Sequence, residues 1–166
     1  MTQQLPPEVV DLLGVALVAE LTVISGTTGR PVSYPLIPFY DGEHVLFTSA
    51  VLFSKKLEHI NANPKVSVAL SDPAAMAGVP FHRAVLKGFA RVLDDEDPHT
   101  SWCALMPLWR AKEPVIDTFV KRRFGIPLFF DRHTIEVVPT RVLLWRDGDT
   151  TRAPEVTDLP VPVGAR

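Results

Sequence analysis

The sequence predicts an α+β fold in which six or seven antiparallel strands form a barrel with helices inserted between them. Apolar, β-branched segments of strand length recur along the chain, and Asp41-Gly42 between two of them is a strong hairpin signal. Segments of helical period separate the groups of strands. The expected order is helix, three strands, helix, two strands, two helices and two strands, which favours a barrel over a parallel sheet.

The first half of the chain begins with a helix and continues with three strands. Pro6 and Pro7 stand at the helix start, where prolines are tolerated, and Gly14 stands past the expected end. Pro35 and Pro38 cannot donate to a β-ladder, so the second strand should lie at a sheet edge or carry bulges. The expected bounds are 6–14 for the helix and 15–25, 31–40 and 43–49 for the strands, the last two being paired.

The second half alternates helices with strands. A helix after Ser54 is stopped by Asn63-Pro64. Gly88, in the middle of a long strand, predicts a bulge or a close backbone approach. Pro107 is expected to end the helix in which it would otherwise lie. The remaining bounds are strands 65–71 and 81–95, helices 98–106 and 114–124, and two last strands within 126–145.

Length and composition indicate one folded domain. The chain has 166 residues, of which 46% are hydrophobic and 22% charged, as in ordinary globular proteins. A net charge of −2 argues against nucleic acid as a partner, and the apolar runs are too short to span a membrane. The N-terminus lacks the regions of a signal peptide, so we expect a cytoplasmic protein. Residues 1–146 should form the domain, and 147–166 an extended arm or a disordered end.

The stretch from 47 to 64 carries the main chemical signal. The strand before it ends in Thr48 and Ser49, and Ser54 stands at the N-cap position of the following helix. Lys55 and Lys56 fall in the first helical turn, where the helix dipole disfavours cations unless an anion lies among them. We interpret the stretch as a phosphate-binding turn; the alternative is a solvated helix start with unfavourable charges.

Other catalytic motifs are missing from the sequence. Five histidines, at 44, 59, 82, 99 and 133, show no metal-ligand spacing, and there is no Walker loop, G-x-S-x-G or G-x-G-x-x-G. The single cysteine, Cys103, excludes an internal disulfide and is expected to be a buried spectator in a helix. An enzyme with these residues has to rely on a cofactor for its chemistry.

Seven short motifs occur in a fixed order. They are G-R-P-x-S-x-P at 29–35, D-G at 41–42, F-T-S at 47–49, S-K-K at 54–56, N-x-N-P at 61–64, K-V-S-V at 65–68 and K-G-F-A-R-V at 87–92. The ordered set resembles the FMN-binding split-barrel superfamily of pyridoxamine 5′-phosphate oxidase and the flavin- or deazaflavin-dependent oxidoreductases. The resemblance covers roughly residues 10–146.

The resemblance implies a six-stranded antiparallel split β-barrel that forms a homodimer, with two flavin sites at the subunit interface. The residues that it assigns to the cofactor phosphate are Thr48, Ser49, Ser54 and Lys55, with Lys56 adjacent. The residues that it places along the isoalloxazine ring are Ser33, Tyr34, Pro35 and Ile37. Lys55→Ala is therefore expected to weaken cofactor binding by about 1.5–3 kcal/mol, the range for a hydrogen bond to a charged group.

Three functional hypotheses follow. In the first, FMN binds and hydride passes to or from a small molecule; the missing Arg-x-His motif argues against pyridoxamine phosphate as that molecule. In the second, the cofactor is F420, and Trp109, Lys121 and Arg122 reach its acidic tail. In the third, the protein is a non-enzymatic flavin or haem carrier. The loop at 51–53, Val-Leu-Phe, is expected either to narrow the phosphate mouth or to reshape the cofactor groove.

Overall fold

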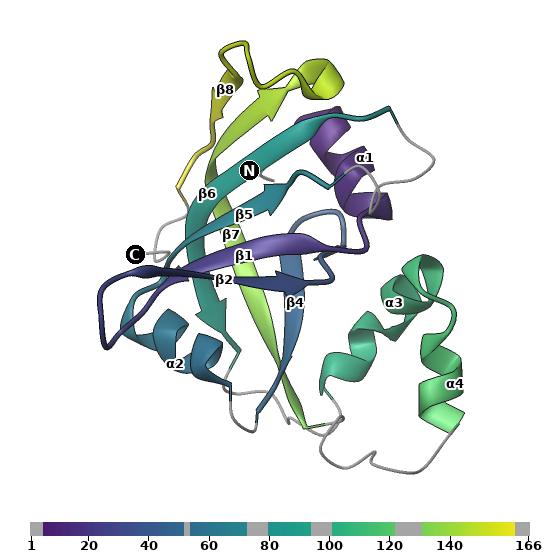
Figure 1. Ribbon diagram of the computed structural model, residues 1–166. Helices are drawn as coiled ribbons and strands as arrows, with labels where there is room; N and C mark the ends of the chain where they lie inside the picture. The colour runs from purple at the N-terminus through teal and green to yellow at the C-terminus, as the bar shows by residue number, and fades with distance from the viewer. Residues whose placement is uncertain (1–4, 52–53, 73–79, 94–100, 122–130, 162–166) are drawn as a thin grey trace.

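The structure, a computed structural model, describes residues 5–51, 54–72, 80–93, 101–121 and 131–161. A strongly curled sheet forms the body, and α3 and α4 form a lobe at its side (Figure 1). The helices are α1 (Pro7–Val15), α2 (Lys55–Ala62), η2 (Ser101–Leu105), α3 (Met106–Lys112), α4 (Ile116–Lys121) and η3 (Arg146–Gly148). The strands are β1 (Ala19–Ile24), β2 (Pro31–Leu36), β3 (Phe39–Tyr40), β4 (Val45–Ala50), β5 (Lys65–Leu70), β6 (Arg83–Val92), β7 (Arg132–Trp145) and β8 (Glu155–Asp158).

All the described strands belong to one antiparallel sheet. Their order is β2-β1-β5-β6-β7-β4-β3, and β8 pairs with β7 outside this order. β7 has 14 residues, and its part from Ile135 to Trp145 pairs with β6 along one side. On the other side, the first part of β7 pairs with β4 and its last part with β8. The predicted α+β fold with an antiparallel barrel is thereby confirmed, and β7 is the strand that joins its two halves.

The prolines of the second expected strand place it at the edge of the sheet. The strand expected over 31–40 is divided at Ile37 and Pro38. Its first part, β2, pairs with β1, while β3 pairs with β4 through the predicted hairpin at Asp41-Gly42. Because β2 and β3 are the two ends of the strand order, the edge position predicted from Pro35 and Pro38 is confirmed.

Gly88 lies where the backbones of β6 and β7 approach each other closely. The register of the pair shifts between Lys87 and Gly88. A Cβ atom added at Gly88 would lie 2.1 Å from the carbonyl oxygen of Val138 and 2.9 Å from Cα of Pro139. The predicted close approach is confirmed, and a bulge lies at this position, but its extra residue is Thr140 on β7 and not a residue of β6. A bulge bends the strand that carries it, so this position helps the sheet to curl.

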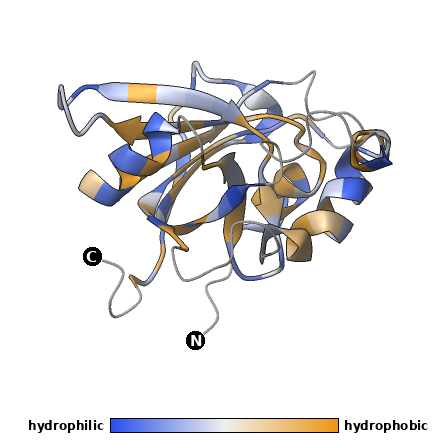
Figure 2. Cartoon of the chain, turned by 90° about the horizontal axis from the view of Figure 1, so that it is seen from below, coloured by the Kyte–Doolittle hydropathy of each residue, from blue (hydrophilic) through white to orange (hydrophobic). Residues whose placement is uncertain are grey.

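The two faces of β4 belong to two separate hydrophobic cores. Phe47 lies in the core enclosed by the curled sheet and α1, whereas its neighbour Leu46 lies in a second core with η2 and α3. Successive strand residues point to opposite faces, which explains the division. Figure 2 shows that hydrophobic residues dominate the strands, while α2 is largely hydrophilic. The second core consists of Phe39, Leu46, Trp102, Leu105, Met106, Trp109 and Ile116.

A half-buried lysine attaches α3 to the barrel. Lys112 Nζ donates to the carbonyl oxygen of Ala16 at 3.1 Å, and to those of Leu13 and Pro38. Leu13 and Ala16 are at the C-terminal end of α1, where helix carbonyls lack partners and the dipole favours a cation. Burial lowers the pKa of Lys112 to about 8. The lysine therefore caps α1 and holds the second core against the first.

Three sequence predictions of element bounds are wrong. Pro107 does not end a helix but lies in the first turn of α3, because a proline at that position lacks only a donor that would have no partner anyway. Gly14 lies inside α1, which continues to Val15. The two strands expected within 126–145 are one continuous strand from residue 132 onward, and 122–130 lie outside the described residues. In the tail, residues 155–158 form β8.

We expect Gly88→Ala to lower the free energy of unfolding by roughly 1–3 kcal/mol, because the added methyl group meets backbone atoms that cannot rotate away. Urea denaturation measures this change. The matched control is Gly14→Ala, whose Cβ would have no neighbour within 4 Å. That change should leave stability equal or raise it by about 0.5–1 kcal/mol, since alanine favours a helix. Equal changes in the free energy of unfolding for Gly88→Ala and Gly14→Ala would contradict the close approach of the β6 and β7 backbones at Gly88.

Candidate functional site

Two hydroxyls and a lysine meet where β4 ends and α2 begins. Ser49 Oγ lies 2.7 Å from Ser54 Oγ, and both side chains are buried. Lys56 Nζ donates to Ser49 Oγ at 3.0 Å and to Ser54 Oγ at 3.4 Å. We call these three residues the serine–lysine cluster. Since β4 and α2 are separated by a short loop, the cluster is formed by residues close together in the sequence.

The Lys56 ammonium lies in an electrostatically unfavourable place. Burial, and then the positive charge of Arg132, lowers its pKa below the usual lysine value. Its polar partners are the two serine hydroxyls, and the ring of Tyr34 lies 5.2 Å away. Among the described residues it has no carboxylate partner. A partly desolvated cation without a counter-ion is stabilised when an anion binds beside it.

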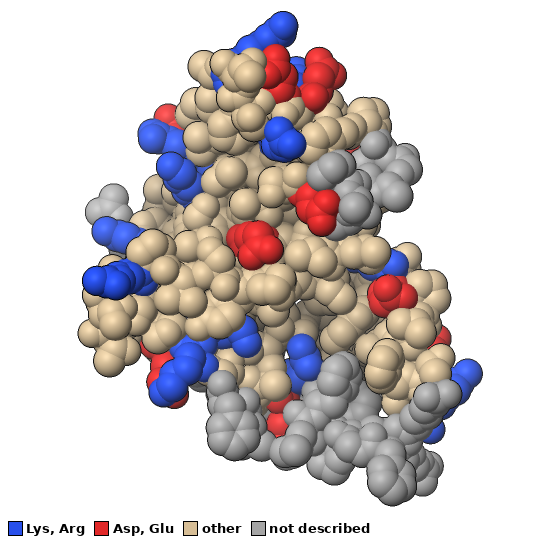
Figure 3. All heavy atoms as spheres, viewed as in Figure 1, with Lys and Arg blue, Asp and Glu red and all other residues tan. Residues whose placement is uncertain are grey.

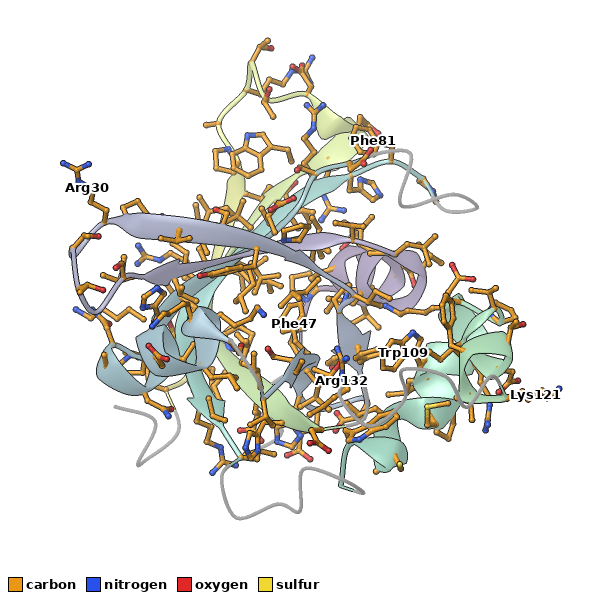
Figure 4. All side chains as sticks on the ribbon, turned by 60° about the horizontal axis from the view of Figure 1, so that its bottom comes forward. Arg30, Phe47, Phe81, Trp109, Lys121 and Arg132 are labelled. Atoms are coloured by element: carbon orange, nitrogen blue, oxygen red, sulfur yellow. The ribbon has the colours of Figure 1, made fainter. Side chains whose placement is uncertain are left out.

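A second cation, Arg132, lies at the start of β7. Its Nε donates to Thr48 Oγ1 at 3.0 Å, and its guanidinium stacks 5.4 Å from the ring of Trp109. Figure 4 shows Arg132 and Trp109 pointing toward each other between β4 and α3. Burial lowers the pKa of Arg132 to about 10, so the side chain is charged at neutral pH. Two cations and three hydroxyls therefore gather at this end of β4.

The residues expected along a cofactor ring lie on β2 and just beyond it. Tyr34 is half-buried, and its ring faces Lys56. Ser33 is exposed, with its Oγ 2.8 Å from Thr22 Oγ1, and Pro35 is exposed as well. Ile37 is half-buried and packs against the second core. Through Tyr34, the edge strand β2 is thus next to the serine–lysine cluster.

The two adjacent lysines have different surroundings. Lys55 is 71% exposed, and its Nζ lies 2.9 Å from Glu58 Oε2, whereas Lys56 points to the serines. Ser54 is at the N-cap position, but its side chain makes no capping hydrogen bond, because it is bonded to Ser49 instead. The assignment of the phosphate to Lys55 stays a prediction; the geometry favours Lys56 as the lysine of the site.

The aromatic and basic residues of the lobe are divided between its core and its surface. Trp109 is 6% exposed and packs against Phe39 and Trp102 at centroid distances of 5.6 and 6.2 Å. Lys121 is exposed at the far end of α4 in Figure 4, away from Arg132. Arg122 lies outside the described residues. Cys103 is exposed, which contradicts the expectation of a buried spectator.

The sequence reasoning missed Arg132. Its partner Thr48 is 84 positions earlier in the chain, and the two come together only because β7 pairs with β4. One signal was present: an arginine directly before an apolar strand, at the alternate position to Thr134 and Glu136. That pattern indicates a shared face, but not which strand supplies the partner.

The arrangement suits the phosphate of a cofactor. The hydroxyls of Thr48, Ser49 and Ser54 and the two cations supply the donors that phosphate oxygens require. Figure 3 shows a hollow between the barrel and the α3–α4 lobe, with Lys and Arg side chains at its border.

In the described part of the chain, no group of His, Cys, Asp and Glu side chains is arranged for a metal ion, and no helix is long and apolar enough to cross a membrane.

Comparisons with known proteins rest on structure. No family model matches the sequence, and no curated protein matches it. Among solved structures, a Clostridium acetobutylicum protein related to general stress protein 26, of the pyridoxinephosphate oxidase family, has a TM-score of 0.60 and 14% identity, with 91% of this chain and 92% of that chain covered. An F420 reductase has a TM-score of 0.58 and 24% identity, with 83% of this chain and 98% of that chain covered. A Mesorhizobium loti FAD-binding protein has a TM-score of 0.55 and 20% identity, with 86% of this chain and 94% of that chain covered.

The fold of this chain is therefore that of the pyridoxamine 5′-phosphate oxidase-like split barrels. The similarity extends over most of each chain, at identities below those that would establish a shared activity. The split-barrel fold implied by the sequence motifs is confirmed by these matches.

Replacing Lys56 by methionine should not destabilise the ligand-free protein. Methionine is similar in length and removes a half-buried charge that lacks a carboxylate partner, so we expect the free energy of unfolding to stay equal or to rise by roughly 0.5–1 kcal/mol. Urea denaturation without ligand measures the effect. Lys55→Met, which breaks an exposed ion pair, is the control and should change stability by less than about 0.5 kcal/mol. A large decrease in the free energy of unfolding for Lys56→Met would mean that the charge of Lys56 is needed for the fold.

Proposed function

We propose that this protein binds FMN and acts as a flavin-dependent oxidoreductase on a small molecule other than pyridoxamine phosphate. The observation that carries the proposal is the Lys56 ammonium, which is bonded to Ser49 and Ser54 without a carboxylate partner among the described residues. The fold shared with proteins described as FAD-binding and as an F420 reductase adds support.

In this proposal the residues of the chain bind and orient the cofactor. Ser49, Ser54 and Lys56 hold the phosphate, and Arg132 adds a second positive charge beside them. The backbone and side chains of β2, with Tyr34 nearest the cluster, lie along the ring system. When bound, a flavin supplies hydride or electron transfer through its ring, so the protein has mainly to position the reactants and to exclude water.

We further propose that the active form is a homodimer. The sequence motifs imply this assembly, and the edge strand β2 lies next to the serine–lysine cluster through Tyr34. Leu17 and Val18, just before β1, are apolar side chains that are 36% and 37% exposed. Light scattering of the purified protein tests the assembly, and a monomer at all concentrations would contradict it.

A second candidate is an F420-dependent oxidoreductase, which is favoured by the match to an F420 reductase at 24% identity. Side-by-side titration with FMN and F420 separates the two candidates by affinity. A third, the non-enzymatic flavin carrier, would bind a flavin but fail to oxidise or reduce any of a panel of acceptors with the reduced cofactor. The absorption spectrum of the protein as purified is the first measurement, because a bound flavin absorbs in the visible range.

Lys56→Met should weaken FMN binding by about 1.5–3 kcal/mol, because it removes a charged donor to the phosphate. Fluorescence titration of the ligand-free protein gives the affinity. Lys55→Met is the matched control and should bind FMN as the wild type does. If only Lys55→Met weakened FMN binding, the phosphate-binding lysine would be the exposed Lys55 and not Lys56. A wild type that binds neither FMN nor F420 would rule out the proposed function.

The preference for FMN over riboflavin, which lacks the phosphate, should fall at alkaline pH. Only the protonated Lys56 attracts the phosphate, and because its pKa is lowered, it loses its proton below the usual lysine value of about 10.5. The ratio of the two affinities should therefore be constant near neutral pH and decline as the pH rises toward about 10. Lys56→Arg, which keeps its charge at residue 56, should show a smaller decline that begins only near pH 10, where Arg132 also loses its proton.

A further inference from the structure

One histidine of the barrel has a buried nitrogen without a partner. Nδ1 of His133 is fully buried and makes no hydrogen bond with the described residues. The other described histidines differ, since Nδ1 of His44 lies 3.3 Å from an Asp41 oxygen, and Nδ1 of His59 and of His82 accept backbone N–H groups at 3.2 and 3.3 Å. Leaving a buried polar atom unpaired destabilises a protein, so such an atom calls for a functional explanation.

The position of His133 places it beside the serine–lysine cluster. In the pairing of β4 with β7, His133 lies directly opposite Ser49. Residues opposite each other in an antiparallel pair point to the same face, with Cβ atoms about 4.5–5.5 Å apart. Ser49 is the residue that bonds both Ser54 and Lys56. Arg132, one position earlier, points to the opposite face and bonds Thr48.

We infer that His133 is a further binding residue of the site, whose Nδ1–H donates to an oxygen of a bound phosphate monoester. This inference rests on the proposed function, because it assumes that the anion held by Lys56 is the phosphate of a cofactor. Nδ1 carries the proton in one of the two neutral tautomers of imidazole. The histidine nitrogen and the lysine ammonium both lack an acidic partner among the described residues. With the ligand bound, both would donate to oxygens of the same phosphate group.

The donors of the site fit a monoester better than a diester. A terminal monoester presents three free oxygens and about two negative charges at neutral pH, as FMN does, whereas a diester presents two free oxygens and one charge. Ser49 and His133 share one face of the β4–β7 pair, where Ser54 and Lys56 join them from the start of α2. Several donors gathered on one face match an ion with three equivalent oxygens, and Arg132 adds its positive charge from the opposite face.

The test compares His133→Phe with His133→Asn. Phenylalanine fills the space without a polar atom, whereas the asparagine amide retains a donor near the position of Nδ1. We expect His133→Phe to be at least as stable as the wild type without ligand, because the unpaired nitrogen is gone. Its FMN affinity should fall roughly tenfold or more, with riboflavin affinity unchanged, and His133→Asn should recover most of the FMN affinity. His82→Phe is the control and should leave both affinities unchanged; its neighbour Phe81 lies far from Arg132 in Figure 4.

Each outcome decides the inference. Equal FMN affinities of wild type and His133→Phe would overturn it and leave the proposed function intact. Loss of stability together with equal loss of affinity for FMN and riboflavin would also overturn it, since that is the result of a structural role. If the wild type binds no flavin, the proposed function fails, and inorganic phosphate becomes the probe. Thermal stabilisation by phosphate that disappears in His133→Phe would then still support the inference, and no stabilisation of the wild type would overturn it.

Discussion

The close approach of the backbones at Gly88 and Val138 is the constraint on which the rest of the structure depends. A side chain at residue 88 would collide with a peptide oxygen, so β6 and β7 can pair in this register only through a glycine. The register shift at the same place bends the sheet. Beyond the bend, residues 135–137 of β7 pair with β6 along one edge and with β4 along the other.

The pairing of β4 with β7 creates the electrostatics of the site. It brings the Arg132 guanidinium to Thr48 on one face and places His133 opposite Ser49 on the other, while the loop to α2 brings in Lys56. The burial that lowers the pKa values of Lys56 and Arg132 also weakens the solvation of their charges. The ligand-free site thus keeps unfavourable interactions, as is common where a protein is built to bind an anion.

Local patterns predicted much of the fold, and long-range pairing explains most of what they missed. The edge position of β2 follows from its prolines, and the serine–lysine cluster lies within one short stretch of sequence. By contrast, Arg132 and His133 reach the site only because β7 pairs with β4, which lies about half the chain length earlier. No local pattern in the sequence reveals this pairing. The choice between Lys55 and Lys56 was also hidden, because adjacent helix residues point in directions about 100° apart. Pro107 was misread because a proline suits a first helical turn as well as a helix end.

The place of β7 in the sheet has a consequence for how the chain folds during synthesis. β4 is complete at residue 50, but the strand that covers most of its edge begins at residue 132. Until that strand leaves the ribosome, most of the edge of β4 stays without its native partner, which exposes the nascent chain to aggregation. Pairing between distant segments is also slow, because a long loop has to close before any contact forms. A ligand that contacts both strands binds only after they have paired, and so it stabilises a contact that the chain can make only late in synthesis.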